Sequence, residues 1–276
     1  EVNLVHVLPE SMDFDKIQGF VNDKLADYVK LLEAEGVKST ANLLHGNHAD
    51  LLVSFAERKK ANLIVLGAGH IGKEKFKLGT NSEKIIRNAS VPVWVIEKEN
   101  VAIPNRVLCP IDFSDESMLA LDSAIHLCRL FESELHLIHA VKRIDAQYGE
   151  WGVDIAVEQA KMVKELEVEL EDLTDQLDLN GITWSKSVIL GDPAGAILDV
   201  IKNENIDLLM MASSGKGTLK RFFLGSVAER VSRKVPCSFI INKSKGMIHL
   251  KLDKGITDIE AIYEDGLELA KQGFVQ

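Results

Sequence analysis

Short apolar runs alternate with longer amphipathic stretches along residues 106–242, and this pattern predicts strands that alternate with helices. The run RVLCPIDF (106–113) is typical of a buried strand, and the residues after it are apolar at helical spacing. Four more runs continue the pattern: ELHLIHAV (134–141), WSKSVILG (184–191), IDLLMMAS (206–213) and CSFIIN (237–242). Nearly continuous apolar strands with helices between them indicate a parallel sheet that is covered on both faces.

The helices expected between these strands begin at residues that favour helix N-termini. Ser114 can cap the helix after the first strand, and two acidic residues in its first turn suit the helix dipole. A long amphipathic helix is expected over about 153–177, and Pro193 suits the first turn of a helix over 193–203. A last helix is expected near 225–234. Parallel sheets of this kind bind ligands beyond the carboxyl ends of their strands.

The chain contains a second, earlier copy of the same pattern. Three pairs of matching segments define it: 1–7 with 134–140, 33–69 with 178–215, and 78–98 with 224–243. A repeat of this length indicates the duplication of a whole domain rather than a solenoid. We therefore predict two tandem, doubly wound α/β domains with parallel sheets of the Rossmann-like type.

The expected domains are residues 1–100 and 106–244, joined by a linker at 101–105. The first domain begins at the equivalent of strand two, so the run at 106–113 has no counterpart in it. A sheet without this inner strand would expose apolar edges. We therefore expect the natural chain to continue ahead of Glu1, unless this half completes its sheet in another way.

Composition narrows the classes of function that remain. With 46% hydrophobic and 27% charged residues the chain resembles a soluble globular protein, and no apolar run approaches the roughly 18 residues of a membrane helix. A net charge of −10 argues against non-specific nucleic-acid binding. The three cysteines lie far apart without a CxxC motif, which indicates buried free thiols in a reducing compartment. We therefore predict a cytoplasmic protein without nucleic-acid or membrane partners.

Several motifs of the second copy carry a family resemblance. They are PIDFS (110–114), LIHAV (137–141), IDLLMMASSG (206–215) and LGSVAERV (224–231). Together they resemble a tandem universal stress protein of the UspA family, over roughly residues 1–243. ATP-binding members of that family carry G-x-x-G, nine residues, and then G-(S/T). Here Gly215, nine residues, Gly225 and Ser226 match this spacing, and Ala212 replaces the first glycine.

The resemblance implies that the two domains have a fold of the adenine-nucleotide-binding type and that the second domain binds ATP, alone or with Mg²⁺. The residues that it assigns to the nucleotide are Asp112, Ala140, Ala212, Ser213, Gly215, Gly225, Ser226 and Val227. The physical pattern agrees, because backbone N–H groups of a glycine loop form an anion site and three basic residues lie between the glycines. Asp112 has an alternative role as a cap of the helix that follows it. A methyl group at Ala212 would crowd the ligand if the turn there needed a positive φ.

The first copy keeps only part of this motif. Gly69, nine residues, Gly79 and Thr80 preserve its second half, and three lysines keep the loop basic. His48 replaces the proline at the helix start, and the aspartate after strand one has no counterpart. We interpret this half mainly as a structural partner, with Gly69, Gly79 and Thr80 as a weaker nucleotide site.

No further catalytic or metal constellation stands out in the sequence. His6 and His139 occupy equivalent positions in the two copies, which favours a feature of the fold over a metal pair. Nucleophile-elbow, HExxH and Walker lysine motifs are absent from the sequence. Together with these absences, the family resemblance favours a nucleotide-dependent regulatory or binding module of the stress response over a committed enzyme. The alternatives are a slow ATP hydrolase of the same fold and a nucleotide-free scaffold.

The ends of the two copies suggest interactions with proteins. In the resembled family the last strand of the sheet mediates dimerisation, and it corresponds here to residues 91–96 and 235–240. The two halves can pair through these strands as an internal pseudo-dimer, and a homodimer is a further option. Residues 245–276 form a helical extension that resembles the start of a tetratricopeptide repeat, which would bind a protein partner. The simpler interpretation is a helix that packs on the second domain.

Overall fold

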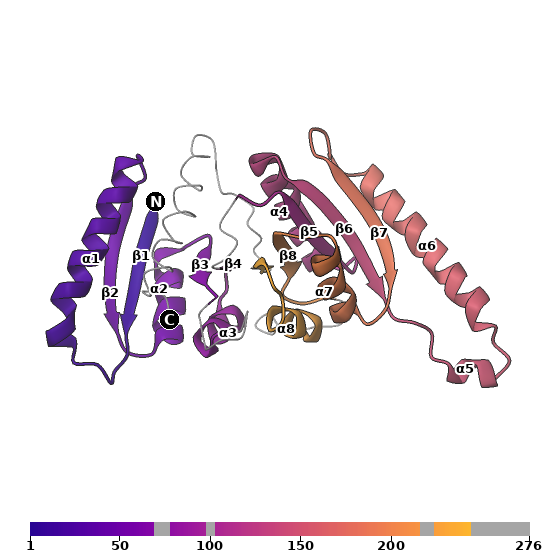
Figure 1. The fold of residues 1–276 in the computed structure, drawn as a ribbon, viewed down its shortest axis with the longest axis horizontal. Helices are drawn as coiled ribbons and strands as arrows, with labels where there is room; N and C mark the ends of the chain where they lie inside the picture. Colours follow the sequence, from indigo (N-terminus) through magenta and orange to yellow (C-terminus); the bar gives the residue numbers. More distant parts are fainter. Residues whose placement is uncertain (69–77, 98–102, 216–223, 244–276) are drawn as a thin grey trace. The chain divides into compact units, whose positions relative to one another are not determined.

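The computed structural model describes residues 1–68, 78–97, 103–215 and 224–243. The described residues form two compact units, unit 1 up to Ile103 and unit 2 from Pro104 (Figure 1). Gly69, the basic residues of both glycine loops and the expected extension at 245–276 lie outside the described residues.

Unit 2 is built on parallel strands in the order β9-β8-β5-β6-β7. They are β5 (Arg106–Ile111), β6 (Glu134–Val141), β7 (Trp184–Leu190), β8 (Leu208–Ala212) and β9 (Ser238–Asn242). The order reverses next to β5, because the chain adds β6 and β7 on one side of it and β8 and β9 on the other. Ligands of doubly wound sheets bind at the carboxyl ends of the strands that flank such a reversal.

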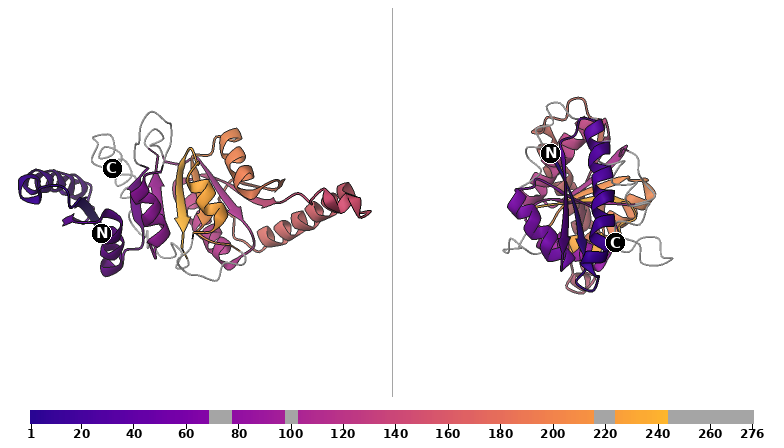
Figure 2. Two further views of the ribbon diagram at one scale, coloured as in Figure 1. Left: turned by 90° about the horizontal axis from the view of Figure 1, so that it is seen from below. Right: turned by 90° about the vertical axis from the view of Figure 1, so that its left-hand side faces the viewer.

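Helices connect the successive strands of unit 2 (Figures 1 and 2). They are α4 (Asp115–Phe131), α5 (Gln147–Glu150), α6 (Ile155–Asp175), α7 (Pro193–Asn203) and α8 (Ser226–Ser232). α4 packs on β5 and β8, α6 packs on β7, and α7 packs against α8. The predicted parallel α/β architecture is confirmed, and the short α5 is an element that the hydrophobic pattern did not predict. Among the described helices, none combines the length and the apolar character that a bilayer crossing requires.

The longer helices of unit 2 begin at side-chain caps. The Ser114 hydroxyl accepts a hydrogen bond from the Ser117 N–H, and Asp154 caps α6 through the Val157 N–H. Asp192 caps α7 just before the predicted Pro193. Each of these side chains satisfies an N–H group that has no partner within its helix.

The sheet of unit 2 forms an apolar core. Every residue of β8 and β9 is buried, and Leu108, Leu209 and Phe239 are completely so. Burial of a side chain of this size contributes about 1.5–3 kcal/mol to folding. The three cysteines are free and buried, as predicted, and burial raises the pKa of the Cys128 thiol to about 12.

The described part of unit 1 contains two pairs of parallel strands. β1 (Val2–Leu8) pairs with β2 (Ser39–His45), and β3 (Ile64–Gly67) pairs with β4 (Val93–Ile96). Its helices are α1 (Phe14–Ala34), α2 (His48–Lys59) and α3 (Thr80–Asn88). α1 packs on β2, and α2 packs against α3.

Within the described residues, no strand joins β1 to β3, whereas β5 joins the equivalent strands β6 and β8 of unit 2. β1 and β3 are correspondingly open to solvent in part, whereas β4 is buried throughout. Val65 of β3 is 41% exposed and residues 2–6 of β1 are only partly buried, while β8 is buried throughout. This exposure agrees with the expectation that loss of the inner strand leaves apolar edges uncovered.

Candidate functional site

Three of the predicted site residues lie level with one another at the carboxyl edge of the unit 2 sheet. In the β5–β6 pair Ile111 is opposite His139, so Asp112 continues the register opposite Ala140. In the β5–β8 pair the register brings Asp112 level with Ser213. These residues therefore lie side by side where the strand order reverses, which is where doubly wound sheets bind ligands.

The Asp112 carboxylate lies against the backbone of Gly215. A Cβ atom at position 215 would stand 2.0 Å from Oδ2 and 3.0 Å from Cγ of Asp112. Only glycine allows the chain after β8 to pass so close to this carboxylate. The structure therefore brings together two predicted site residues that follow different strands.

The start of α4 orients Asp112. Its Oδ1 accepts hydrogen bonds from the N–H (3.1 Å) and the hydroxyl of Ser114. Its own N–H donates to the Ser117 hydroxyl at 3.3 Å. Ser114, rather than Asp112, is the cap of α4. Asp112 is thus held by the helix start while its Oδ2 faces Gly215.

The turn that carries Asp112 contains a strained residue. Phe113 has a φ of 58°, a left-handed conformation that costs energy in a residue other than glycine. Its ring packs on the His139 ring at 4.9 Å between centroids, and Nδ1 of His139 donates to the Ile111 carbonyl at 2.9 Å. His139 therefore contacts both sides of the turn. This geometry agrees with its interpretation as a feature of the fold, but its support of Asp112 was missed.

The start of α8 lies against the end of β8. The Gly225 N–H donates to the Ser213 carbonyl at 2.7 Å. A Cβ at position 225 would stand 3.4 Å from the Ser213 oxygen and from Cα of Ser214. α8 then begins with Ser226, which is exposed, and Val227, which is partly buried. Both glycines of the predicted motif thus lie at close backbone approaches around the end of β8.

The departure from the family motif at Ala212 causes no backbone strain. Ala212 is the last residue of β8 and pairs with Asn242 of β9. It is not among the described residues with positive φ. Because its backbone is extended, the methyl group meets none of the strain that a left-handed turn would impose.

The equivalent residues of unit 1 have a different surrounding. Gly79 and Thr80 begin α3 as Gly225 and Ser226 begin α8. No described atom, however, lies within 4 Å of a Cβ at position 79. The described part of unit 1 also has no strand equivalent to β5, and so it has no counterpart of Asp112.

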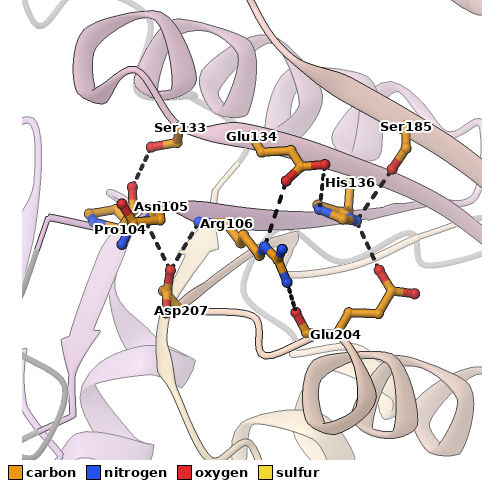
Figure 3. A network of polar contacts seen from close by, with 9 residues as sticks. All are labelled: Pro104, Asn105, Arg106, Ser133, Glu134, His136, Ser185, Glu204 and Asp207. Atoms are coloured by element: carbon orange, nitrogen blue, oxygen red, sulfur yellow. Dashed lines mark hydrogen bonds and ion pairs between the residues drawn. The ribbon is translucent and has the colours of Figure 1, made fainter.

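A second polar network lies at the opposite, amino-terminal edge of the unit 2 sheet (Figure 3). Nδ1 of His136 lies 2.9 Å from the Glu204 carboxylate, and its Nε2 lies 3.3 Å from that of Glu134. Arg106 donates to the Glu204 carbonyl at 2.8 Å, and its N–H donates to Asp207 at 3.0 Å. No group of three or more metal-ligating side chains suited to an ion occurs among the described residues. This network anchors the start of β5, away from the candidate site.

The fold and the site together define the class of protein. It is a tandem α/β protein whose second unit carries a glycine-flanked loop at the switch point of a doubly wound sheet. Residues 1–97 and 104–243 match the model of the universal stress protein family, and the chain belongs to that family. The resemblance predicted from the motifs is thereby confirmed.

Individual relatives match different parts of the chain. Universal stress protein MJ0531 of Methanocaldococcus jannaschii is 46% identical over 70 residues, which are 25% of this chain and 41% of that protein. Universal stress protein YxiE of Bacillus subtilis is 32% identical over 146 residues, 50% of this chain and 97% of that protein. The solved structure of a universal stress protein from Archaeoglobus fulgidus has a TM-score of 0.64 at 23% identity, with 88% of both chains covered. The match thus spans less than half of MJ0531, and the solved structure supports the fold.

Proposed function

We propose that unit 2 binds an adenine nucleotide, ATP, at the carboxyl edge of its sheet, and that the protein is a nucleotide-dependent regulatory module of the stress response. The observation that carries this proposal is the approach of the Asp112 carboxylate to the Gly215 backbone, next to the hydrogen bond between Gly225 and Ser213. A carboxylate beside a glycine loop offers acceptors for sugar hydroxyls and N–H donors for phosphates in one place.

Asp112, Ala140 and Ser226 have defined roles in this proposal. Asp112 accepts hydrogen bonds from ribose hydroxyls, and the small side chain of Ala140 leaves room for the base beside β6. The hydroxyl and the backbone N–H of Ser226, at the start of α8, donate to the phosphates. Mg²⁺, when it accompanies the nucleotide, is held mainly by the phosphates and water, because it keeps much of its hydration shell.

Unit 1 has a structural role in this proposal. Two residues of its weaker site, Gly79 and Thr80, begin α3, and no described atom lies within 4 Å of a Cβ built at position 79. The absence of an Asp112 counterpart from the described part of unit 1 removes the acceptor for the sugar. The proposal therefore assigns the nucleotide site to unit 2.

Two measurements on the purified chain test the proposal. Mass spectrometry after denaturation identifies any nucleotide that is retained from purification, and calorimetric titration with ATP measures binding. An ATP concentration of 100 Kd is expected to stabilise the fold by about 2.7 kcal/mol. Turnover of labelled ATP in the same sample separates a binding module from a slow hydrolase. The proposal is wrong if millimolar ATP produces neither heat nor thermal stabilisation.

A further inference from the structure

In unit 2 an ion pair with two parallel hydrogen bonds ties the start of α7 to α8. The two terminal nitrogens of the Arg230 guanidinium, Nη1 and Nη2, donate to Oδ1 and Oδ2 of Asp192, each at 2.8 Å. Oδ2 of Asp192 also accepts from the Gly195 N–H at 3.1 Å and so caps α7. Two parallel bonds fix the orientation of a guanidinium as well as its position.

Asp192 lies at the same edge of the sheet as the candidate site. The N–H of Gly191, just before it, donates at 2.9 Å to the carbonyl of Val141, the last residue of β6. Val141 directly follows the predicted site residue Ala140. Hydrogen bonds from Arg230, and after them the one from Gly195, lower the pKa of Asp192, which keeps the carboxylate charged.

Arg230 lies on the same face of α8 as Ser226, because the two residues are one helical turn apart. Side chains on a helix point toward its N-terminus, so the guanidinium is directed back along the first turn. That turn is also held by the hydrogen bond from Gly225 to Ser213. α8 is therefore attached at one point to the end of β8 and at a second point to the start of α7.

Unit 1 has lost both members of this pair together. Asn47 caps α2 as Asp192 caps α7, and Lys84 takes the place of Arg230 in the matched segments LGTNSEK and LGSVAER. A neutral asparagine preserves the cap but cannot form an ion pair. Unit 1 therefore keeps the cap but not the ion pair, so the role of the ion pair is distinct from capping. The described part of unit 1 also has no counterpart of Asp112.

We propose that Asp192 and Arg230 are a positioning pair that fixes the first turn of α8, and with it Ser226, against the end of β8. This inference rests on the proposed nucleotide site in unit 2. The affinity for ATP then depends on the Asp192–Arg230 ion pair, which lies outside the glycine loop. The pair acts by holding α8 in place and does not touch the nucleotide.

The test uses the whole chain with three substitutions. Asp192→Asn keeps an oxygen that can cap α7 and removes the charge, while Arg230→Lys keeps the charge and removes the two-point geometry. Arg129→Lys is the matched control. Arg129 lies in the last turn of α4, at the far end of that helix from Asp112, and forms an exposed ion pair with Asp178. ATP affinity is expected to fall about tenfold in both pair variants and to stay unchanged in the control. Exposed ion pairs contribute little to global stability, so all three variants are expected to fold.

Hydrogen exchange of the ligand-free variants supplies an independent measurement. We expect the amides of residues 229–232, beginning with Glu229, whose N–H donates to the Gly225 carbonyl, to exchange faster in Asp192→Asn and Arg230→Lys than in the wild type or the control. The inference is overturned if hydrogen exchange in Asp192→Asn and Arg230→Lys equals that of the wild type. It is also overturned if the wild type binds ATP and both variants bind it with the same affinity. If the wild type binds no ATP, the proposed function and the affinity effect both fail. Exchange then decides alone whether the pair fixes α8.

Discussion

Units 1 and 2 share one pattern of strands and helices, and among the described residues only unit 2 contains the inner strand β5. In unit 2, β5 lies between β6 and β8, and Asp112 directly follows it. In the described part of unit 1, the equivalent strands β1 and β3 lie in separate pairs. A single strand thus accounts for the continuous core of unit 2 and for the acidic group of its candidate site. The inner strand at the switch point of a doubly wound sheet is therefore both a structural and a functional element.

The largest expected effect concerns the core next to this strand. Met210 of β8 is completely buried, whereas Val65, which it matches in the segments DLLMMA and NLIVLG, is 41% exposed. Met210→Ala is expected to lower the free energy of unfolding by about 2–5 kcal/mol, because it leaves a cavity, and Val65→Ala by less than about 1 kcal/mol. Chemical denaturation measures both values. Equal losses would show that the sheet of unit 1 is as closed at β3 as that of unit 2 is at β8.

Gly215→Ala is expected to have the next largest effect, because its methyl group would overlap Oδ2 of Asp112. ATP binding should be abolished, and the free energy of unfolding should fall by about 1–3 kcal/mol through overpacking. Gly79→Ala is the control from unit 1, since its φ is −66° and no described atom lies within 4 Å of the added Cβ. Calorimetry with ATP and thermal unfolding test both variants. Wild-type ATP affinity in Gly215→Ala would exclude this loop as the nucleotide site.

Asp112→Asn removes a charge while it keeps the shape of the side chain. The ATP affinity is expected to fall about tenfold, because hydrogen bonds to charged groups are stronger than neutral ones. The stability of the ligand-free chain should change little, since the remaining oxygen can still accept from Ser114. Asp115→Asn, in the exposed first turn of α4, is the control for the loss of one negative charge. Equal affinities of the two variants in a calorimetric titration would remove Asp112 from the site.

Much of unit 2 could be predicted from the sequence because its signals are local. The apolar run that forms β5, the Ser114 cap and Pro193 each lie within or beside the element that they define. Gly225 and Ser226 could be identified because they follow Gly215 at the fixed spacing of the loop motif. The concern about Ala212 could not be decided from the sequence, because it depended on a backbone conformation that the structure shows to be extended.

The remaining features of the candidate site depend on contacts between distant segments. The approach of Asp112 to Gly215 joins the ends of two strands, and the left-handed Phe113 is supported by a ring from a third. Asp192 and Arg230 are 38 residues apart. No local pattern of hydrophobicity or spacing predicts such contacts. One signal could have been found in the sequence: Asp192 and Arg230 are both replaced in the first copy, by Asn47 and Lys84.

The smallest expected effect separates the two units by pH. Hydrogen bonds from Arg230 lower the pKa of Asp192 below its ordinary value of 3.8, whereas Asn47 of unit 1 does not titrate. The Asp192 carboxylate therefore stabilises the folded state above pH 3.8, and this contribution is lost as the pH falls through the lower pKa of the folded chain. The thermal midpoints of the wild type and Asp192→Asn should differ slightly at neutral pH and converge in acid. A difference that persists at the lowest pH would assign the effect to capping instead of charge.

Hydrogen exchange with and without ATP tests the proposed nucleotide site most directly, because it compares both units in one sample. A nucleotide bound between Asp112 and the start of α8 is expected to slow exchange in residues 106–117 and 224–232. Exchange in residues 78–88, which include α3, should not change. The absence of protection in unit 2, or equal protection at α3 and α8, would contradict a nucleotide site that depends on the inner strand β5.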